Sequence, residues 1–253
     1  MQIDNSFEDI LSLDGLPFIQ ALLKYEEDRF DRAFLKGSVY EEMNADFGIF
    51  PSAKVYPLYF AGDILHPKDK LVFMGINPGY QTEANRAEQA YLESKGSFEG
   101  YRDIFAWRAF QGRMYAYFSH IGGFLQRLGW LDGPITWPWI HEHLLNMNLI
   151  AYHSKDTNGL RINDLGRYKH RYLTPILKIL DYINPSRPVF INGYKSFRAV
   201  FTDPLFSDVI KVEEGDGIWV GTIGRHRFIG LPFLNRPRGG KDRIVEAVKR
   251  HLP

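Results

Sequence analysis

Four short and nearly uninterrupted apolar runs limit the folds open to this chain more than any other feature. Segments with helical spacing of apolar residues lie between them. Apolar strands that alternate with helices are typical of a parallel sheet with helices on both faces. We therefore predict an α/β fold of three αβα layers around a central four-stranded, mostly parallel sheet. The predicted strands are LVFMGI (71–76), LLNMNLIAY (144–152), PVFING (188–193) and HRFIGLPF (226–233).

The predicted helices suggest how the chain is organised. One of them, 16–35, precedes all four strands, and we assign residues 1–65 to an N-terminal helical extension. No stretch rich in Pro, Gly and Ser divides the chain, so we predict one domain over 1–253. The stretch 218–231 also fits a hairpin with Gly224 at its turn, and this alternative stays open. The other predicted helices are 114–130, 172–183, 194–201 and 241–252.

The composition excludes several classes of protein. The chain has no Cys, which rules out disulfides, thiolate zinc sites and a Cys nucleophile, and which fits a reducing cytoplasm. Its net charge of +1 gives no overall attraction to nucleic acid, so such binding needs a local basic patch. The N-terminal stretch lacks the pattern of a secretory signal, and no run nears the ~20 apolar residues that span a bilayer. We expect a cytoplasmic monomer without membrane contact.

The first predicted strand ends in an unusual loop, Gly75-Ile76-Asn77-Pro78-Gly79-Tyr80. Ligands of open α/β sheets bind outside the carboxyl ends of the strands, where this loop begins. The glycines permit a tight turn and close approach of the backbone to a ligand. Asn77 offers an uncharged donor and acceptor that suits a water or the edge of a heterocycle, but it is no strong general base. The spacing is not that of a Walker phosphate loop, and a simple strand-to-helix turn is the alternative.

The run GINPG after an apolar strand resembles motif 1 of the uracil-DNA glycosylase superfamily. The match is best to its mismatch-specific thymine/uracil branch and its single-strand-selective monofunctional branch, and the resemblance extends from about residue 71 to the C-terminus. It implies that Asn77 positions the water that attacks the sugar C1′, and that Gly75 and Ile76 line the base pocket. It also implies an aromatic face for the base, for which we choose Tyr80. The alternatives in the following segment are Tyr91, Phe98 and Tyr101.

The second predicted strand resembles the superfamily strand whose Asn reads the uracil edge. In LLNMNLIAYHS this alignment selects Asn146 as the base-reading residue. A second alignment selects Asn148, and both amides lie on one face because side chains alternate along a strand. A core amide with satisfied hydrogen bonds is the other role available, and we favour it for Asn148. His153, just after this strand, is either a pocket residue or a structural one.

The loop after the fourth predicted strand resembles motif 2 of the superfamily, which inserts an apolar or basic side chain into the DNA groove. Aligning Pro232 with the Pro of that motif puts Leu231 where many members carry a catalytic His. The thymine/mismatch branch also lacks this His, so the change implies a lower rate. We predict Leu234, flanked by Phe233, as the wedge that fills the space left by a flipped base. The predicted DNA-contacting residues are Pro232, Phe233, Leu234, Asn235, Arg236, Arg238 and Lys241.

The resemblance implies a monofunctional DNA glycosylase that needs no metal and no cofactor. Such an enzyme flips uracil, or a related damaged or mismatched base, out of single- or double-stranded DNA and hydrolyses its N-glycosidic bond. His141 and His143 come nearest to a metal pair, but on a helix they point to different faces. Two alternatives stay open. One is a catalytically weak or inactive protein of the same fold that binds nucleic acid or a protein partner, and the other is an enzyme acting on a free nucleoside or a modified RNA base.

Overall fold

The computed structural model of the chain describes residues 6–30, 41, 44–46, 55–79, 82–112, 114–153, 161–215, 217–235 and 241–252. Its contacts group the chain into two compact units. The prediction of a single domain over 1–253 stays a prediction. The first unit comprises Met1–Tyr59, Asn77–Tyr101 and Asn148–Ile183, and the second comprises Phe60–Ile76, Arg102–Met147 and Asn184–Pro253.

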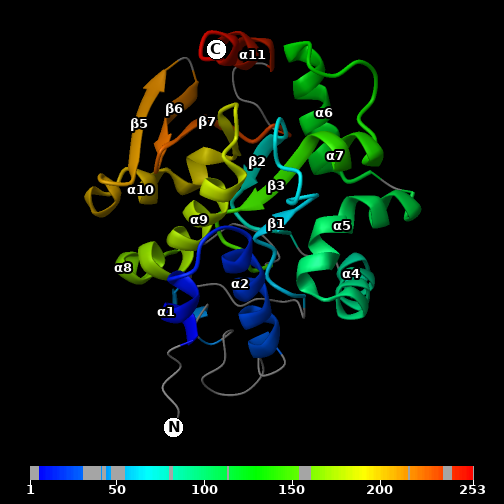
Figure 1. Cartoon of the computed structure of the whole chain (residues 1–253). Coiled ribbons are helices and arrows are strands. Elements are labelled where there is room, and N and C mark those ends of the chain that lie inside the picture. Colours follow the sequence, from blue (N-terminus) through cyan, green and yellow to red (C-terminus); the bar gives the residue numbers. More distant parts are fainter. Residues whose placement is uncertain are drawn as a thin grey trace. The chain divides into compact units, whose positions relative to one another are not determined.

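The second unit is built on a sheet to which the described residues contribute seven strands (Figure 1). These are β1 (Phe60–Ala61), β2 (Leu71–Gly75), β3 (Leu144–Asn148), β4 (Val189–Asn192), β5 (Ile210–Gly215), β6 (Ile218–Ile223) and β7 (His226–Leu231). Their order is β1-β3-β2-β4-β7-β6-β5. β4 pairs in parallel with β2 and with β7, whereas the β1–β3, β5–β6 and β6–β7 pairs are antiparallel. The fold is therefore mixed α/β.

The four predicted strands are confirmed at the centre of this sheet as β2, β3, β4 and β7. The prediction that the sheet has only four strands is wrong, because β1 extends it beyond β3, and β6 and β5 extend it beyond β7. Of these extra strands, β1 and β5 were not predicted, because β1 is two residues long and most of β5 is at least partly exposed. The hairpin alternative is confirmed, with β6 antiparallel to β7 and Gly224 at the turn with a φ of 58°.

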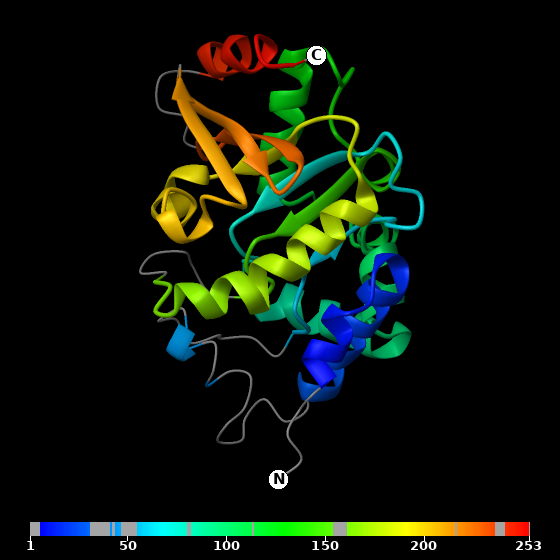
Figure 2. The same cartoon turned by 60° about the vertical axis from the view of Figure 1, so that its left-hand side comes forward.

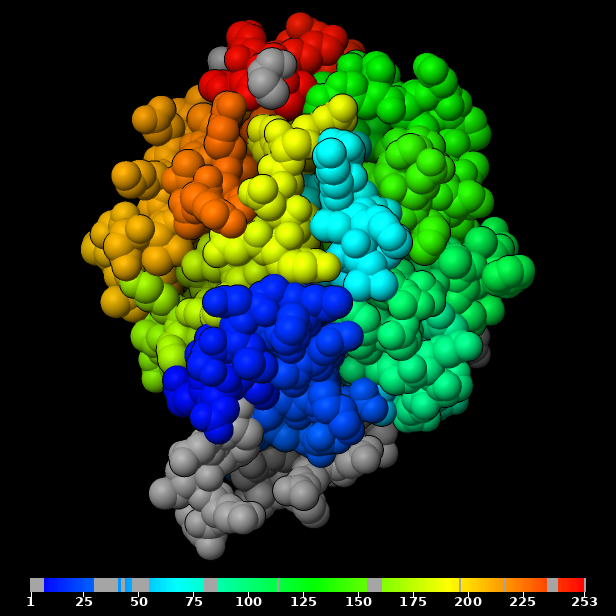
Figure 3. All heavy atoms as spheres, in the orientation of Figure 1, coloured from blue at the N-terminus to red at the C-terminus, as the bar shows by residue number. Residues whose placement is uncertain are grey.

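Helix α6 (Ala116–Leu128) covers the strands at the centre of the sheet. The ring centroid of Phe124 lies 6.3 Å from that of Phe73 in β2 and 5.7 Å from that of Phe190 in β4. Helix α11 (Lys241–Lys249) packs beside α6, as the red and green atoms at the top of Figure 3 show. Further elements of this unit are α7 (Trp137–His143), η2 (Tyr194–Phe197), α10 (Arg198–Phe201) and η3 (Pro204–Phe206).

The described part of the first unit is mainly helical. Helix α2 (Gly15–Phe30) contacts α9 (Thr174–Ile183), and its apolar face is buried. The predicted helix 16–35 is confirmed as far as Phe30, and its remainder lies outside the described residues. No helix in the described ranges has the length and apolar character to cross a membrane. Figure 2 shows one continuous rod formed by α8 (Leu165–Arg167), the π-helical η1 (Tyr168–Leu173) and α9. The other helices are α1 (Ser6–Leu11), α4 (Thr82–Lys95) and α5 (Ser97–Phe110), which continues into the second unit.

Candidate functional site

The order of the central strands points to the carboxyl end of β2 as a candidate ligand site. From β2 the chain crosses to β3 on one side, and the next central strand, β4, lies on the other side of β2. In doubly wound sheets, ligands bind at such a reversal, outside the carboxyl ends of the two strands that flank it. The Gly-Ile-Asn-Pro-Gly loop follows β2 at this reversal. The strand order thus points to the same loop as the sequence motif, by a separate argument.

The loop after β2 combines a buried beginning with an open end. Ile76 is 3% exposed and Pro78 is buried, whereas Asn77 is half-buried. The Nδ2 atom of Asn77 donates a long hydrogen bond of 3.4 Å to the main-chain oxygen of Tyr152, which belongs to the same unit. Gly79 is exposed, and a Cβ built on it would meet nothing within 4 Å. Packing among the described residues therefore does not require glycine at position 79.

The two candidate base-reading asparagines have different surroundings. Asn148 is 3% exposed, and its Nδ2 donates to the main-chain oxygen of Leu58 at 2.9 Å. Its main-chain N–H also donates to the main-chain oxygen of Tyr59 at 3.2 Å, so Asn148 has the core role favoured above. Asn146 is 7% exposed, and its Oδ1 accepts a hydrogen bond of 2.9 Å from the hydroxyl of Tyr117. In the part of the chain that the structure describes, the amide of Asn146 is thus held at its Oδ1 end by Tyr117.

Tyr117 is a site residue that the sequence reasoning missed. It lies in α6, 29 residues before Asn146, and no motif links the two positions. Burial raises the pKa of Tyr117 above its ordinary value, so its hydroxyl is protonated at neutral pH and donates to Asn146. The Phe118 ring packs edge-on against both neighbours. Its centroid lies 5.0 Å from that of the Tyr117 ring and 5.3 Å from that of the Trp137 ring. Tyr117, the hydrogen-bond partner of Asn146, thus belongs to a cluster of aromatic rings within the second unit.

The loop after β7 is fastened to the end of β4. The main-chain N–H of Gly193 donates to the oxygen of Leu231 at 3.0 Å, and the N–H of Leu234 donates to Oδ1 of Asn192 at 3.1 Å. Leu231 is fully buried at the end of β7. The Phe233 ring lies so close to Gly193 that a Cβ there would stand 2.3 Å from it. Asn192 and Gly193 thus set the course of this loop, although neither was singled out from the sequence.

The predicted wedge, Leu234, does not project from the protein. Its side chain is 6% exposed, and its main-chain N–H is bonded to Asn192. A wedge role for Leu234 would require it to leave this position, whereas Phe233 is 38% exposed and Asn235 is exposed on the same loop. The side chains that line a small hollow together with Leu234 come from α6 and α11, and they are His120, Phe124, Arg127, Lys241, Ile244 and Val245.

Three predicted site residues, Tyr80, Arg236 and Arg238, lie outside the described residues. Among the predicted DNA-contacting cations, Lys241 is described, and it is exposed at the start of α11. Pro232 is half-buried and continues directly from β7.

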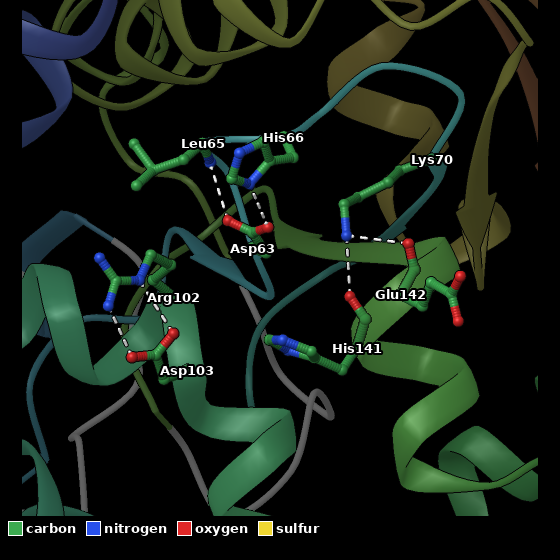
Figure 4. Close-up of polar contacts among 8 residues, drawn as sticks. All are labelled: Asp63, Leu65, His66, Lys70, Arg102, Asp103, His141 and Glu142. Carbon is green, nitrogen blue, oxygen red and sulfur yellow. Dashed lines mark hydrogen bonds and ion pairs between the residues drawn. The ribbon is translucent and has the colours of Figure 1, made fainter.

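The polar side chains around α7 tie that helix to the sheet. Figure 4 shows Nζ of Lys70, just before β2, donating to the main-chain oxygens of His141 at 2.8 Å and Glu142 at 2.9 Å. Burial lowers the pKa of Lys70, although the charges of Asp63 and Glu142 oppose this. Asp63 itself accepts from the main-chain N–H of Leu65 at 3.2 Å. Within the described ranges, no group of three His, Asp or Glu side chains is arranged to hold a metal ion.

Gly193→Ala should loosen the loop after β7. The φ of Gly193 is 79°, which an alanine adopts at a cost of about 1 kcal/mol, and the added Cβ would displace the Phe233 ring. We expect the free energy of unfolding, measured by urea denaturation, to fall by about 1–2 kcal/mol. Gly123→Ala in α6 is the matched control, because a Cβ there meets nothing within 4 Å and alanine stabilises a helix by about 0.5–1 kcal/mol. If the two substitutions changed the free energy of unfolding equally, the packing of Phe233 on Gly193 would be contradicted.

No family model and no curated protein matches this sequence. The likeness to the uracil-DNA glycosylase superfamily therefore depends on the short motifs in the order in which they occur along the chain. Function has to be argued from the site itself.

Proposed function

We propose that this chain is a monofunctional DNA glycosylase, which flips uracil or a related damaged or mismatched base out of DNA and hydrolyses its N-glycosidic bond. The proposal includes the three-layer αβα arrangement of the uracil-DNA glycosylase superfamily, DNA as the partner, a monomeric state and a cytoplasmic location. The observation that carries it is the reversal of strand order at β2, because a loop bearing an uncharged Asn and an open Gly follows the strand at which a ligand is expected.

Asn77 is the residue to which the proposal assigns the attacking water. With Nδ2 directed to the main-chain oxygen of Tyr152, Oδ1 is the atom that would accept a hydrogen bond from that water. The water oxygen forms a bond to C1′ as the bond from C1′ to the base nitrogen breaks. The electron pair of that bond leaves with the base, and the water gives up a proton to solvent. With no catalytic His at position 231, an Asn amide and a main-chain N–H would have to hold the charge on the departing base.

Asn146 would read the base through its Nδ2 hydrogens, because Tyr117 occupies its Oδ1. An amide N–H donates to a carbonyl, so the arrangement suits bases that carry a carbonyl where cytosine and adenine carry an amino group. Lys241 would contact the DNA phosphates, and the exposed residues of the loop after β7 would contact the phosphates and the stacked bases.

Tyr117→Phe should relax the choice of base. Without the hydroxyl, the Asn146 amide is able to turn its Oδ1 toward the ligand and accept from an amino group. We expect the preference for uracil over cytosine, measured as the ratio of cleavage rates in otherwise identical oligonucleotides, to fall about 10-fold. Tyr115→Phe serves as the control, since Tyr115 lies near Trp137 with no bond to Asn146 among those described. An unchanged ratio in Tyr117→Phe would show that Asn146 does not depend on this bond.

The direct test of the proposed activity is base release. Purified protein is incubated with oligonucleotides that contain uracil, a thymine mismatch or hypoxanthine, and abasic sites are cleaved with alkali and counted. Abasic product from at least one of them is expected, in the presence of a chelator as well as without it. No product from any of the three, at excess enzyme and long times, would refute the proposal.

A second candidate is a binding protein of the same fold that has lost the chemistry. It is favoured by Leu231, a fully buried apolar residue at the position where the resemblance implies a catalytic His. Tight DNA binding that is unchanged in Asn77→Ala, together with no abasic product, would select this candidate.

A further inference from the structure

Helix α2 buries a carboxyl group where its pattern calls for an apolar side chain. Residues 18, 19, 22 and 23 form the buried stripe of the helix, and Glu26 continues it one turn later with an exposure of 2%. Burial raises the pKa of Glu26, while its bonds to tyrosine hydroxyls and the charges of Arg171 and Arg29 oppose the rise. A buried carboxyl is costly compared with a well-packed apolar side chain of similar volume. Packing alone therefore does not account for Glu26.

Glu26 binds two tyrosines that come from distant parts of the first unit. Its Oε1 accepts hydrogen bonds from the hydroxyl of Tyr59 at 2.8 Å and from that of Tyr152 at 3.0 Å, and its Oε2 lies 3.1 Å from the latter. The Tyr172 ring packs edge-on against Tyr152, with centroids 6.2 Å apart. Both bonded tyrosines are buried, so each is held at its hydroxyl end by the same carboxyl group.

The main chains of these two tyrosines bond to Asn77 and Asn148, which lie in the same unit. The oxygen of Tyr152 accepts from Nδ2 of Asn77 at 3.4 Å. The oxygen of Tyr59 accepts from the N–H of Asn148 at 3.2 Å. The side chain of Glu26 thus anchors the segment against which the Asn77 amide rests, and separately anchors the segment that holds the core amide of Asn148.

We infer that Glu26 is a positioning residue of the site: through the hydroxyl of Tyr152 it fixes the carbonyl that orients the Asn77 amide. The inference rests on the proposed function. It gives the N-terminal segment, which the resemblance does not cover, a part in the chemistry. Helix α2 then helps to position the loop that carries Asn77.

Tyr152→Phe and Tyr59→Phe make a matched pair for testing this inference. Each removes one hydroxyl bonded to Glu26, and so each should cost similar stability. Only Tyr152 carries the carbonyl that meets Asn77. Two measurements are made on the full chain. The first is the pair of side-chain amide signals of Asn77 in a ¹H–¹⁵N spectrum, assigned by their loss in Asn77→Ala. The second is the single-turnover rate on a uracil-containing oligonucleotide, with KM determined separately.

Tyr152→Phe should shift the Asn77 amide signals and lower the single-turnover rate about 10-fold with little change in KM, because a small misplacement of a positioning group slows chemistry more than binding. Tyr59→Phe should leave the signals in place and the rate within about 2-fold. Unmoved Asn77 signals in Tyr152→Phe, or equal effects of the two variants, would overturn the inference. If the wild-type protein releases no base, the proposed function fails, and the Asn77 signals still decide whether Glu26 acts through Tyr152.

Discussion

Asn77→Ala should slow base release from a uracil-containing oligonucleotide about 100-fold or more, with DNA binding nearly unchanged. The amide is proposed to hold the attacking water at C1′, and removal of one group that positions a reactant or stabilises charge commonly costs 10²–10³ in rate. The measurement is the single-turnover rate at saturating enzyme, together with the dissociation constant for the same oligonucleotide by fluorescence anisotropy.

This loss should not come from unfolding. Asn77 is half-buried and its hydrogen bond to Tyr152 is 3.4 Å long, so the free energy of unfolding should fall by less than about 1 kcal/mol. Asn235→Ala is a control of the same chemistry on the exposed loop after β7, and it should raise KM a few-fold while the saturated rate stays constant. An unchanged rate in Asn77→Ala would remove Asn77 from the mechanism.

Glu26→Ala should lower the free energy of unfolding by about 2–4 kcal/mol. The substitution leaves a cavity beneath α2 and strips the buried hydroxyls of Tyr59 and Tyr152 of their common acceptor. Glu26→Gln keeps the volume and one acceptor oxygen, so it should cost much less. Urea denaturation at neutral pH measures both variants. Asp28→Asn on the same helix is the control, since Asp28 is exposed, pairs with Lys24 on the surface, and should change stability by less than about 0.5 kcal/mol.

The pH dependence of the free energy of unfolding shows in which protonation state Glu26 stabilises the fold. Burial raises the pKa of Glu26 above its ordinary value of 4.5, so the folded protein binds this proton more tightly than the unfolded chain. The stability that the carboxyl contributes is therefore full below about pH 4.5 and is lost as the pH rises through the raised pKa. Glutamine does not ionise. The stability of Glu26→Gln relative to the wild type should thus increase from about pH 4.5 upward and then level off, and a difference that stays flat or decreases would contradict the raised pKa.

The centre of the sheet could be predicted because its strands are buried on both faces. Such strands consist of nearly unbroken apolar residues, and β2, β3, β4 and β7 are each visible in that way. β5 was missed because its edge position leaves most of its residues partly or fully exposed. β1 was missed because a strand of two residues is too short to show periodicity.

The residues of the candidate site that could be predicted lie in short motifs. Gly75 to Gly79 form one loop, and the conformational freedom of glycine and the chemistry of an amide can be recognised from the residues themselves. The bond from Tyr117 to Asn146 and the bonds from Tyr59 and Tyr152 to Glu26 join positions 29, 33 and 126 residues apart. No local pattern records such pairs. Leu234 was predicted to project because its loop resembles motif 2, but its side chain is buried and lines a small hollow with residues of α6 and α11.

By itself, the sequence determined the α/β class, the central strands and the position of the Asn77 loop at the end of one of them. Each of these follows from short-range effects, namely the burial of apolar runs, helical periodicity and the backbone freedom of glycine. Only the tertiary structure decided which strand neighbours which, and so where the strand order reverses. It also decided that the side-chain amide of Asn148, and not that of Asn146, is hydrogen-bonded to the main chain of the core. It decided as well that a carboxyl group on α2 bonds to Tyr152. These depend on hydrogen bonds and packing between segments far apart in the chain, which form only once the whole fold brings them into contact.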